Sequence, residues 1–323
     1  MSGSKLILIV FPLLMLSACA SEESISPDPG QLFELKSPDL TGIQFANNLQ
    51  ETEYLNYFSY PYMYFGGGVA IFDIDNDGLN DVLLTGNMVT TRLYKNMGQF
   101  KFEDITQRAG LRTKNRWVTG VSVGDVNGDG FLDFYLCVSG KDITGNNPRF
   151  SRENLLFINN TDGTFKELGE EYKVNDNGMS VQSIFFDLEN DGDLDLYITS
   201  YPEAKFNSSN EFWNMKVKNP SMDESDHLYR NDGDYFTEIT NESGVLNYGL
   251  SLNVLATDIN NDGFSDLYVS NDFNTPDYFY INNGDGTFSN KLNDYFRQTS
   301  NYGMGSDMAD FNNDGLIDLI QLD

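Results

Sequence analysis

Short apolar segments alternate with tight polar turns along most of the chain. Runs such as 69–72 and 181–186 stand before a series of Asp-rich turns, and runs such as 82–84 and 267–270 stand after them. These runs are rich in β-branched and aromatic residues and are bounded by Gly, Asn and Asp, which is typical of β-strands joined by hairpins. The pattern therefore predicts an all-β protein in which each Asp-rich turn joins one strand to the next.

One nine-residue pattern, D-x-[D/N/E]-x-D-G-x-x-D, occurs five times. We number the copies loop one (73–81), loop two (125–133), loop three (187–195), loop four (258–266) and loop five (310–318). Segments such as 93–106 and 280–288, which follow the loops, predict two further strands around an Asn/Gly turn. Four strands in a unit of this length indicate a blade of a β-propeller, with the loop between the first and second strand of each blade.

The spacing of oxygen-bearing side chains in each loop suits calcium, which takes about six to eight oxygen ligands. Side chains at positions 1, 3 and 5 can converge, the Gly at position 6 allows a sharp turn, position 7 offers a backbone carbonyl, and the Asp at position 9 closes the shell. Magnesium fits less well, because it demands near-ideal octahedral geometry. The predicted ligands are Asp73, Asp75, Asp77, Leu79, Asp81, Asp125, Asn127, Asp129, Phe131, Asp133, Asp187, Glu189, Asp191, Asp193, Asp195, Asp258, Asn260, Asp262, Phe264, Asp266, Asp310, Asn312, Asp314, Leu316 and Asp318.

The residues that flank the loops exclude other calcium motifs. EF-hand loops need a carboxylate at position 12 and a helix on each side, and dockerin-type loops also keep an oxygen ligand at position 12. Here position 12 is Leu84, Leu136, Ile198, Val269 or Gln321. Loop three carries Glu189 at position 3, one methylene longer than Asp, so we expect this site to be distorted or weaker. The ions are expected to fold the blades.

The N-terminus has the features of an exported lipoprotein. The apolar run 6–16 is too short to span a bilayer and has the length of a signal-peptide core. The segment 16–19 ends in Cys19 and resembles a bacterial lipobox, which implies cleavage before Cys19 and diacylation of its sulfur; an ordinary signal peptide with an incidental cysteine is the alternative. We therefore expect a signal peptide over 1–18, a flexible tether over 19–40 and the propeller over 41–323.

The net charge limits the classes of partner that the chain is expected to bind. Asp and Glu number 49 against 20 Lys and Arg, which gives a net charge of −29. Such a chain should repel nucleic acid and anionic membrane surfaces, so nucleic acid is not expected as a partner and the membrane is expected to be reached only through Cys19. Because the Asp residues recur at fixed spacings beside aromatic residues, they indicate cation sites rather than a disordered acidic tract. Cys137 has no partner and is expected to be a buried, inert thiol.

The motif Phe-Gly-Gly-Gly-Val-Ala at 65–70, and the run L-Y-x-N-x-G…F-x-D-I-T…A-G-L after loop one, resemble the FG-GAP/VCBS-repeat proteins, whose blades are similar to those of the integrin α-subunit head. The resemblance covers roughly 40 to 323. It implies a calcium-stabilised propeller, usually of seven blades, and here up to five Ca²⁺; bacterial relatives often carry a further C-terminal module of the ASPIC/UnbV type. With about five to six blades present, we expect an incomplete propeller that lacks its closing blades.

These features favour an outer-membrane-anchored module for binding, adhesion or nutrient uptake, facing either the cell surface or the periplasm. Its ligand would be an extracellular glycan or protein. A glycan-active propeller enzyme is the alternative, but His227 is the single histidine and the conspicuous carboxylates are assigned to calcium.

Segment 283–288 faintly resembles a sialidase Asp-box and predicts a hairpin turn. Segment 201–226, with Trp213 and three lysines, is either a contact surface or a loop packed on its own blade.

Overall fold

The computed structural model describes residues 32–140, 151–203 and 208–323 of the 323-residue chain. Residues 38–323 form one compact unit, to which the following description applies. The predicted signal peptide, the predicted lipidation site Cys19 and most of the predicted tether lie outside the described residues. In the described ranges, no helix combines the length and the apolar character needed to cross a membrane.

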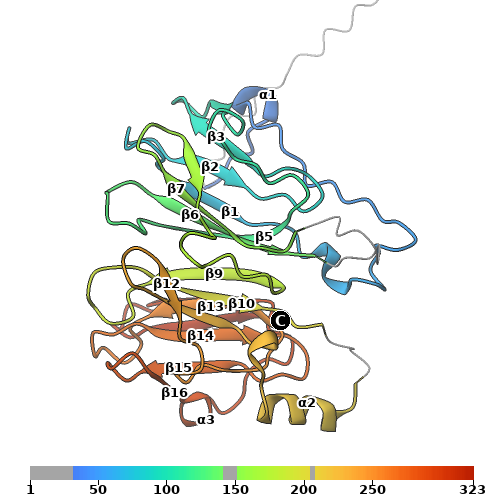
Figure 1. Cartoon of the computed structure of the whole chain (residues 1–323), viewed down its shortest axis with the longest axis vertical. Helices are drawn as coiled ribbons and strands as arrows, with labels where there is room; N and C mark the ends of the chain where they lie inside the picture. Colours follow the sequence, from blue (N-terminus) through green and yellow to red (C-terminus); the bar gives the residue numbers. More distant parts are fainter. Residues whose placement is uncertain (1–31, 141–150, 204–207) are drawn as a thin grey trace, which may run out of the picture. The chain divides into compact units, whose positions relative to one another are not determined.

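Within the described ranges of this unit, four antiparallel sheets have four strands each and one has two strands. Figure 1 shows the sheets following one another from β1 to β16. In every sheet, each strand pairs with the next one in the chain. The first two sheets consist of β1 (Val69–Phe72), β2 (Asp81–Leu84), β3 (Arg92–Asn96) and β4 (Phe102–Asp104), and of β5 (Trp117–Gly124), β6 (Asp133–Ser139), β7 (Leu155–Asn159) and β8 (Phe165–Glu167).

The third sheet consists of β9 (Ser180–Phe186), β10 (Asp195–Ser200), β11 (His227–Asn231) and β12 (Phe236–Glu238). The fourth consists of β13 (Ser251–Thr257), β14 (Asp266–Asn271), β15 (Tyr278–Asn282) and β16 (Phe288–Asn290), and the fifth of β17 (Gly305–Ala309) and β18 (Asp318–Leu322). The helices are short: α1 (Pro38–Thr41), α2 (Asn210–Lys218), α3 (Leu292–Tyr295) and the 3-10 turns η1 (Pro61–Tyr64) and η2 (Met222–Glu224).

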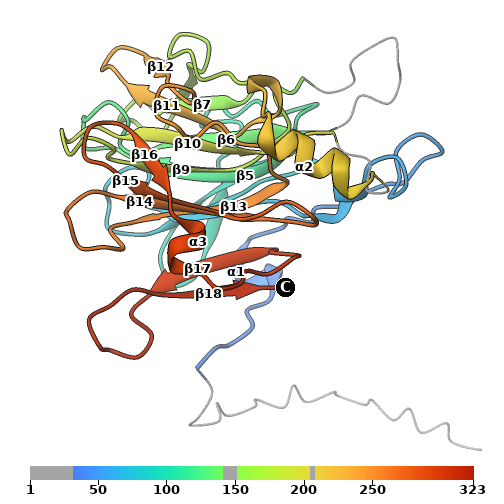
Figure 2. The same ribbon diagram turned by 90° about the horizontal axis from the view of Figure 1, so that it is seen from below.

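The first strands of consecutive sheets lie beside one another: β1 contacts β5, β5 contacts β9, β9 contacts β13 and β13 contacts β17. Figure 2 shows the fifth sheet, in red, as the layer that follows β13 and β14. Sheets that follow one another through their first strands are the blades of a propeller. The predicted all-β propeller is therefore confirmed, with four complete blades and the first two strands of a fifth.

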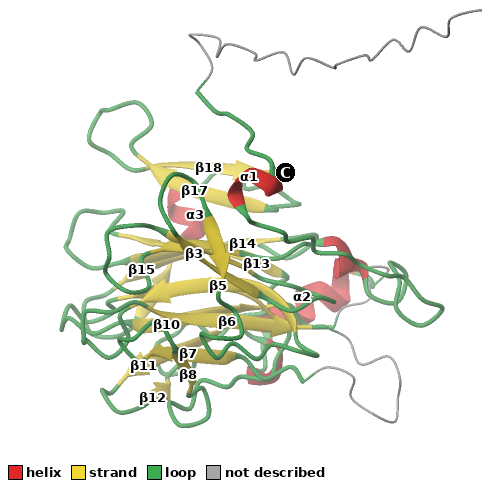
Figure 3. Ribbon diagram, turned by 90° about the horizontal axis from the view of Figure 1, so that it is seen from above, coloured by secondary structure: helices red, strands yellow, loops and turns green. Residues whose placement is uncertain are grey.

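The apolar core lies between neighbouring blades. One buried cluster joins the first blade to the second through Phe72, Leu83 and Phe134, and corresponding clusters join the second to the third and the third to the fourth. Strands β6 and β10 are buried along their whole length, as expected for strands covered on both faces. Figure 3 shows α2, in red, to one side of the central strands. Cys137 on β6 is buried as predicted, and burial raises the pKa of its thiol to about 12.

Asparagines at the ends of the third strands connect each blade to the preceding one. The side-chain amides of Asn159, Asn231 and Asn282 donate to the carbonyl oxygens at position 2 of the preceding blade's loop, at distances of 2.8, 3.1 and 3.0 Å. The acceptors are Ile74, Val126 and Leu188. These amides are buried, so each bond satisfies polar groups that would otherwise be costly to exclude from water.

His227, at the start of β11, has both ring nitrogens engaged. Its Nδ1 lies 2.6 Å from Oδ2 of Asp176, and its Nε2 lies 2.9 Å from the carbonyl oxygen of Met222. Burial disfavours the imidazolium, but the hydrogen bond and charge of Asp176 outweigh it and raise the pKa of His227 to about 9. Burial likewise opposes ionisation of Asp176, yet His227 lowers the pKa of that carboxyl below its ordinary value.

The His227–Asp176 pair predicts a specific pH dependence of stability. The folded-state pKa of His227 lies above its ordinary value of 6.5. The pair therefore contributes its full share of the unfolding free energy below about pH 6.5, and this contribution is lost as pH rises through about 9. The loss should be on the order of 3 kcal/mol of unfolding free energy. Urea denaturation at pH 6 and at pH 9.5 measures it.

His227→Gln and Asp176→Asn are the matched controls, since each removes one partner of the pair. Both variants should be less stable than the natural chain at pH 6, and both should lose less stability on going to pH 9.5. An identical pH dependence in all three proteins would contradict the ion pair.

Candidate metal centres in the Asp-rich loops

Each Asp-rich loop joins the first strand of a blade to the second, as predicted. The Asp at position 9 is the first residue of the second strand in all five blades, in β2, β6, β10, β14 and β18. The loops therefore occupy equivalent places in successive blades. Those of neighbouring blades also touch: Nδ2 of Asn76 donates to the Gly130 carbonyl at 3.0 Å, and Nδ2 of Asn190 to the Gly263 carbonyl at 2.7 Å.

Two residues with left-handed backbone make the turn in each loop. Position 4 has a φ of 56° at Asn76, and Asn190, Asn261 and Asn313 adopt similar values. Position 6 is always Gly, as at Gly78 with a φ of 85°. Asn tolerates this conformation and Gly adopts it at little cost, so the Asn and Gly content of the repeat specifies the turn.

The Asp at position 1 holds the loop closed. In loop one the Asp73 carboxylate accepts hydrogen bonds from the backbone N–H groups of Asp77 and Gly78, at 3.2 and 2.7 Å. The same pair of bonds recurs at the other position-1 residues, Asp125, Asp187, Asp258 and Asp310. The Asp at position 5 accepts from the N–H of position 7, at Leu79, Phe131, Asp193, Phe264 and Leu316.

The Asp at position 9 connects the loop to two further segments. In loop two, Oδ2 of Asp133 accepts from the N–H of Val126 at 2.9 Å, and Oδ1 accepts from the N–H of Asn159, the last residue of β7, at 2.7 Å. Burial nevertheless raises the pKa of Asp133 to about 6 and that of its counterpart Asp195 to about 7. A carboxylate whose pKa is raised by burial gains from a nearby cation.

Loop one brings three predicted ligands together. Carboxylate oxygens of Asp73, Asp75 and Asp81 lie within 4.8 Å of one another. Lys95 on β3 also reaches this cluster: its Nζ contacts Asp75 and lies 3.2 Å from Oδ2 of Asp77. The Lys95 ammonium was not predicted, and it supplies one positive charge where a divalent ion would supply two.

Among the described residues of the other four loops, no three acidic side chains come as close together as those of loop one. Loops two, four and five carry Asn127, Asn260 and Asn312 at position 3, so one of their predicted oxygen ligands is neutral. The amides of Asn127 and Asn260 donate to the Asp at position 5, at 3.1 and 2.8 Å, within the same loop.

Three buried carboxylate oxygens in the loops have no hydrogen-bond partner within the described part of the chain: Oδ1 of Asp75, Oε2 of Glu189 and Oδ1 of Asp193. All three residues are predicted ligands. In loop three, the pKa of Asp193 is raised to about 6, mainly by burial and further by the neighbouring Asp191. Burial also raises the pKa of Glu189. Asp193 was predicted to contribute only its backbone carbonyl at position 7, whereas its side chain adds a fifth carboxylate to the loop.

These loops can hold a hard cation. Their donor atoms are carboxylate, amide and carbonyl oxygens, the ligand set that calcium prefers, and buried carboxylates without partners lower their free energy by binding an ion. The residues present therefore fit Ca²⁺ in loops one and three.

Segment 201–226 packs in part on its own blade. Trp213 of α2 is 2% exposed and belongs to a buried cluster with Tyr248 and Tyr201, so it does not lie on a contact surface. Lys216 pairs with Glu224 within the same segment. Met215 remains exposed, and Lys205 lies outside the described residues.

Comparison with known proteins supports the repeat assignment. A family model described as FG-GAP-like repeat matches residues 73–136 and 258–320, which include loops one, two, four and five. Cartilage acidic protein 1 from Xenopus tropicalis is 27% identical over 78% of this chain and 39% of its own length. The Homo sapiens protein of the same name is 24% identical over 78% of this chain and 38% of its own length. The chain thus spans well under half the length of these curated relatives.

Two solved structures show weaker likenesses. A GH43 β-1,3-galactosidase with galactodeoxynojirimycin is 10% identical, with a TM-score of 0.39 over 70% of this chain and 74% of the galactosidase chain. A Photorhabdus luminescens Tc holotoxin pore is 19% identical, with a TM-score of 0.37 over 80% of this chain and 11% of the holotoxin chain. At these TM-scores, neither structure bears on the function of this chain. The chain carries FG-GAP-like repeats and is similar to cartilage acidic protein 1.

Proposed function

We propose that this chain is a calcium-stabilised propeller that binds an extracellular glycan or protein ligand, as part of a lipoprotein anchored in the outer membrane through Cys19. The observation that carries the calcium assignment is the set of buried, unpartnered carboxylate oxygens at Asp75, Glu189 and Asp193. Divalent ions would offset part of the net charge of −29 and would relieve the repulsion among the carboxylates of each loop.

A binding role is favoured over catalysis because the histidine and aspartate side chains that could act as acids or bases are already hydrogen-bonded within the protein. His227 has both ring nitrogens bonded, to Asp176 before β9 and to Met222 of η2, and the position-9 aspartates are bonded to backbone N–H groups. A cavity of about 420 Å³ lies where the first strands of the blades converge, and among the described residues that line it none is acidic. Val69, Val121, Val181, Leu252 and Met304 give this cavity an apolar wall.

Removal of calcium should destabilise the protein. A single site filled at a hundredfold excess over its Kd contributes about 2.7 kcal/mol to the unfolding free energy, so chelation with EGTA should lower the Tm by several degrees. Calcium added in excess should restore the Tm, whereas magnesium should restore little of it. A Tm that EGTA leaves unchanged would contradict calcium-dependent folding.

Lys95→Met should tighten calcium binding. The Lys95 ammonium sits against Asp75 and Asp77, and its removal takes away a charge that competes with the ion. We expect the midpoint of a calcium titration, followed by Tm, to move to a calcium concentration lower by up to about tenfold, which corresponds to about 1.4 kcal/mol.

Arg92→Met is the matched control for Lys95→Met. Arg92 lies on the same strand, β3, but pairs with Asp104, away from loop one. An equal shift in both variants would indicate a general charge effect, and an absence of any shift in Lys95→Met would show that loop one does not take up the ion.

A glycan array that also records hydrolysis tests the ligand class. The proposal predicts retention of the calcium-loaded protein on a subset of glycans without release of reducing sugar. Release of reducing ends would instead support the glycan-active enzyme.

A further inference from the structure

Side chains at position 4 connect the Asp-rich loops in pairs. Nδ2 of Asn76 in loop one donates to the carbonyl oxygen of Gly130 in loop two, at 3.0 Å. Nδ2 of Asn190 in loop three donates to the carbonyl oxygen of Gly263 in loop four, at 2.7 Å. Loop two carries Gly128 at position 4, which has no side chain, so loop two makes no such bond to loop three. Position 4 therefore joins loop one to loop two and loop three to loop four.

Each of these bonds leads to a predicted ligand of the next loop through one peptide group. In loop two, the carbonyl of Gly130 and the N–H of Phe131 belong to the same peptide group, and that N–H donates to Oδ1 of Asp129 at 2.9 Å. In loop four, the N–H of Phe264 donates to Oδ1 of Asp262 at 3.0 Å in the same way. A hydrogen bond accepted by the carbonyl of a peptide group polarises its N–H. The bond from the preceding loop therefore strengthens the contact that holds the position-5 ligand.

On the donor side, the bonding asparagine stands between two predicted ligands of its own loop. Asn76 separates Asp75 from Asp77, and Asn190 occupies the equivalent position in loop three. Both asparagines have left-handed backbone, with φ values of 56° and 60°. An ion held by the ligands on either side of the asparagine would fix this backbone, and with it the amide that reaches the next loop.

The two loops of each pair differ in charge. Loops one and three carry a carboxylate at position 3, whereas loops two and four carry the neutral Asn127 and Asn260 there. Each pair therefore joins a more acidic loop to a following loop that is less acidic. Because the charge of the ligands helps to set the affinity for calcium, the less acidic loop is expected to bind the ion more weakly on its own. A bond from an ordered neighbour would then matter most for filling this loop.

We propose that calcium binding is positively coupled within these two pairs of loops, through Asn76 and Asn190, and that Gly128 removes this route of coupling between loops two and three. The inference rests on the calcium binding proposed above. An ion in the first loop of a pair favours the asparagine conformation that bonds with the second loop. By linkage, an ion in the second loop raises the affinity of the first by the same factor. Because both bonds are exposed to solvent, the factor is expected to be about two- to tenfold.

Hydrogen exchange read by mass spectrometry, across a calcium titration of the full chain, tests the coupling because it reports each loop separately. The midpoint of a loop is the calcium concentration at which half of its calcium-dependent protection has appeared. Asn76→Gly should raise the midpoint of loop two by about two- to tenfold and leave those of loops three and four unchanged. Asn190→Gly should raise the midpoint of loop four and leave those of loops one and two unchanged. Gly suits position 4, since Gly128 occupies it in loop two with a φ of 71°.

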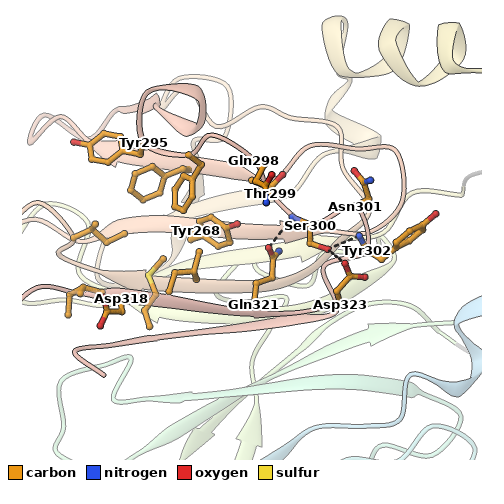
Figure 4. A pocket seen from close by; sticks show the side chains of 16 residues that line it. Tyr268, Tyr295, Gln298, Thr299, Ser300, Asn301, Tyr302, Asp318, Gln321 and Asp323 are labelled. Carbon is orange, nitrogen blue, oxygen red and sulfur yellow. Dashed lines mark hydrogen bonds between the residues drawn. The ribbon is translucent and has the colours of Figure 1, made fainter. Parts of the chain in front are cut away.

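Asn261→Gly is the matched control. Asn261 occupies position 4 of loop four, but its side-chain amide donates to no described residue. The next loop, loop five, is closed like the others: Oδ2 of Asp318, which Figure 4 labels, accepts from the N–H of Phe311 at 3.2 Å. The control should therefore leave the midpoint of loop five unchanged, even where the new Gly gives the backbone of loop four more freedom.

The outcomes separate the coupling from calcium binding itself. If calcium protects the loops but Asn76→Gly leaves the midpoint of loop two unchanged, the coupling is overturned and calcium binding is retained. An equal shift of loop five in Asn261→Gly would also overturn the coupling, because the effect would then come from the Gly rather than from a lost hydrogen bond. If calcium protects no loop of the natural chain, the proposed calcium binding is contradicted, and this inference with it.

Discussion

The position-9 aspartate is the constraint on which the rest of the structure depends. One of its oxygens accepts from the start of its own loop, and in the complete blades the other accepts from the last residue of the third strand. A single side chain such as Asp195 thus fixes the turn between the first two strands and the register of the third. The side-chain amide of the same third-strand Asn donates to a carbonyl of the preceding blade. These buried hydrogen bonds therefore fix the position of each blade against the one before it.

This construction concentrates negative charge where the blades turn. Buried aspartates such as Asp133 and Asp195 have raised pKa values because burial disfavours their charged forms, and the neighbouring carboxylates of the loops add to the effect. Hydrogen bonds from backbone N–H groups offset part of that cost but leave oxygens of Glu189 and Asp193 without partners. A divalent cation would balance these charges and bind the side chains that define the turn, so ion binding and folding would be coupled.

Much of this architecture could be predicted from the sequence, because it depends on local spacing. Loop positions such as Asp73 and Gly78, the start of β2 at Asp81 and the hairpin turn at 283–288 follow from patterns of a few residues. The role of the third-strand asparagines was missed, although Asn159, Asn231 and Asn282 recur at equivalent places; the acceptors of their side-chain amides lie in the preceding blade, far away in the sequence. Burial of Trp213 and the contact of Lys95 with loop one depend on tertiary packing in the same way.

Native mass spectrometry in micromolar calcium tests the central claim most directly, because it counts the ions that remain on the folded chain. The account predicts up to five bound calcium ions, with loops one and three filled, and loss of one ion when Glu189 and Asp193 are both replaced by Ala. A folded chain that carries no calcium, or that retains the same number of ions after this double substitution, would contradict it.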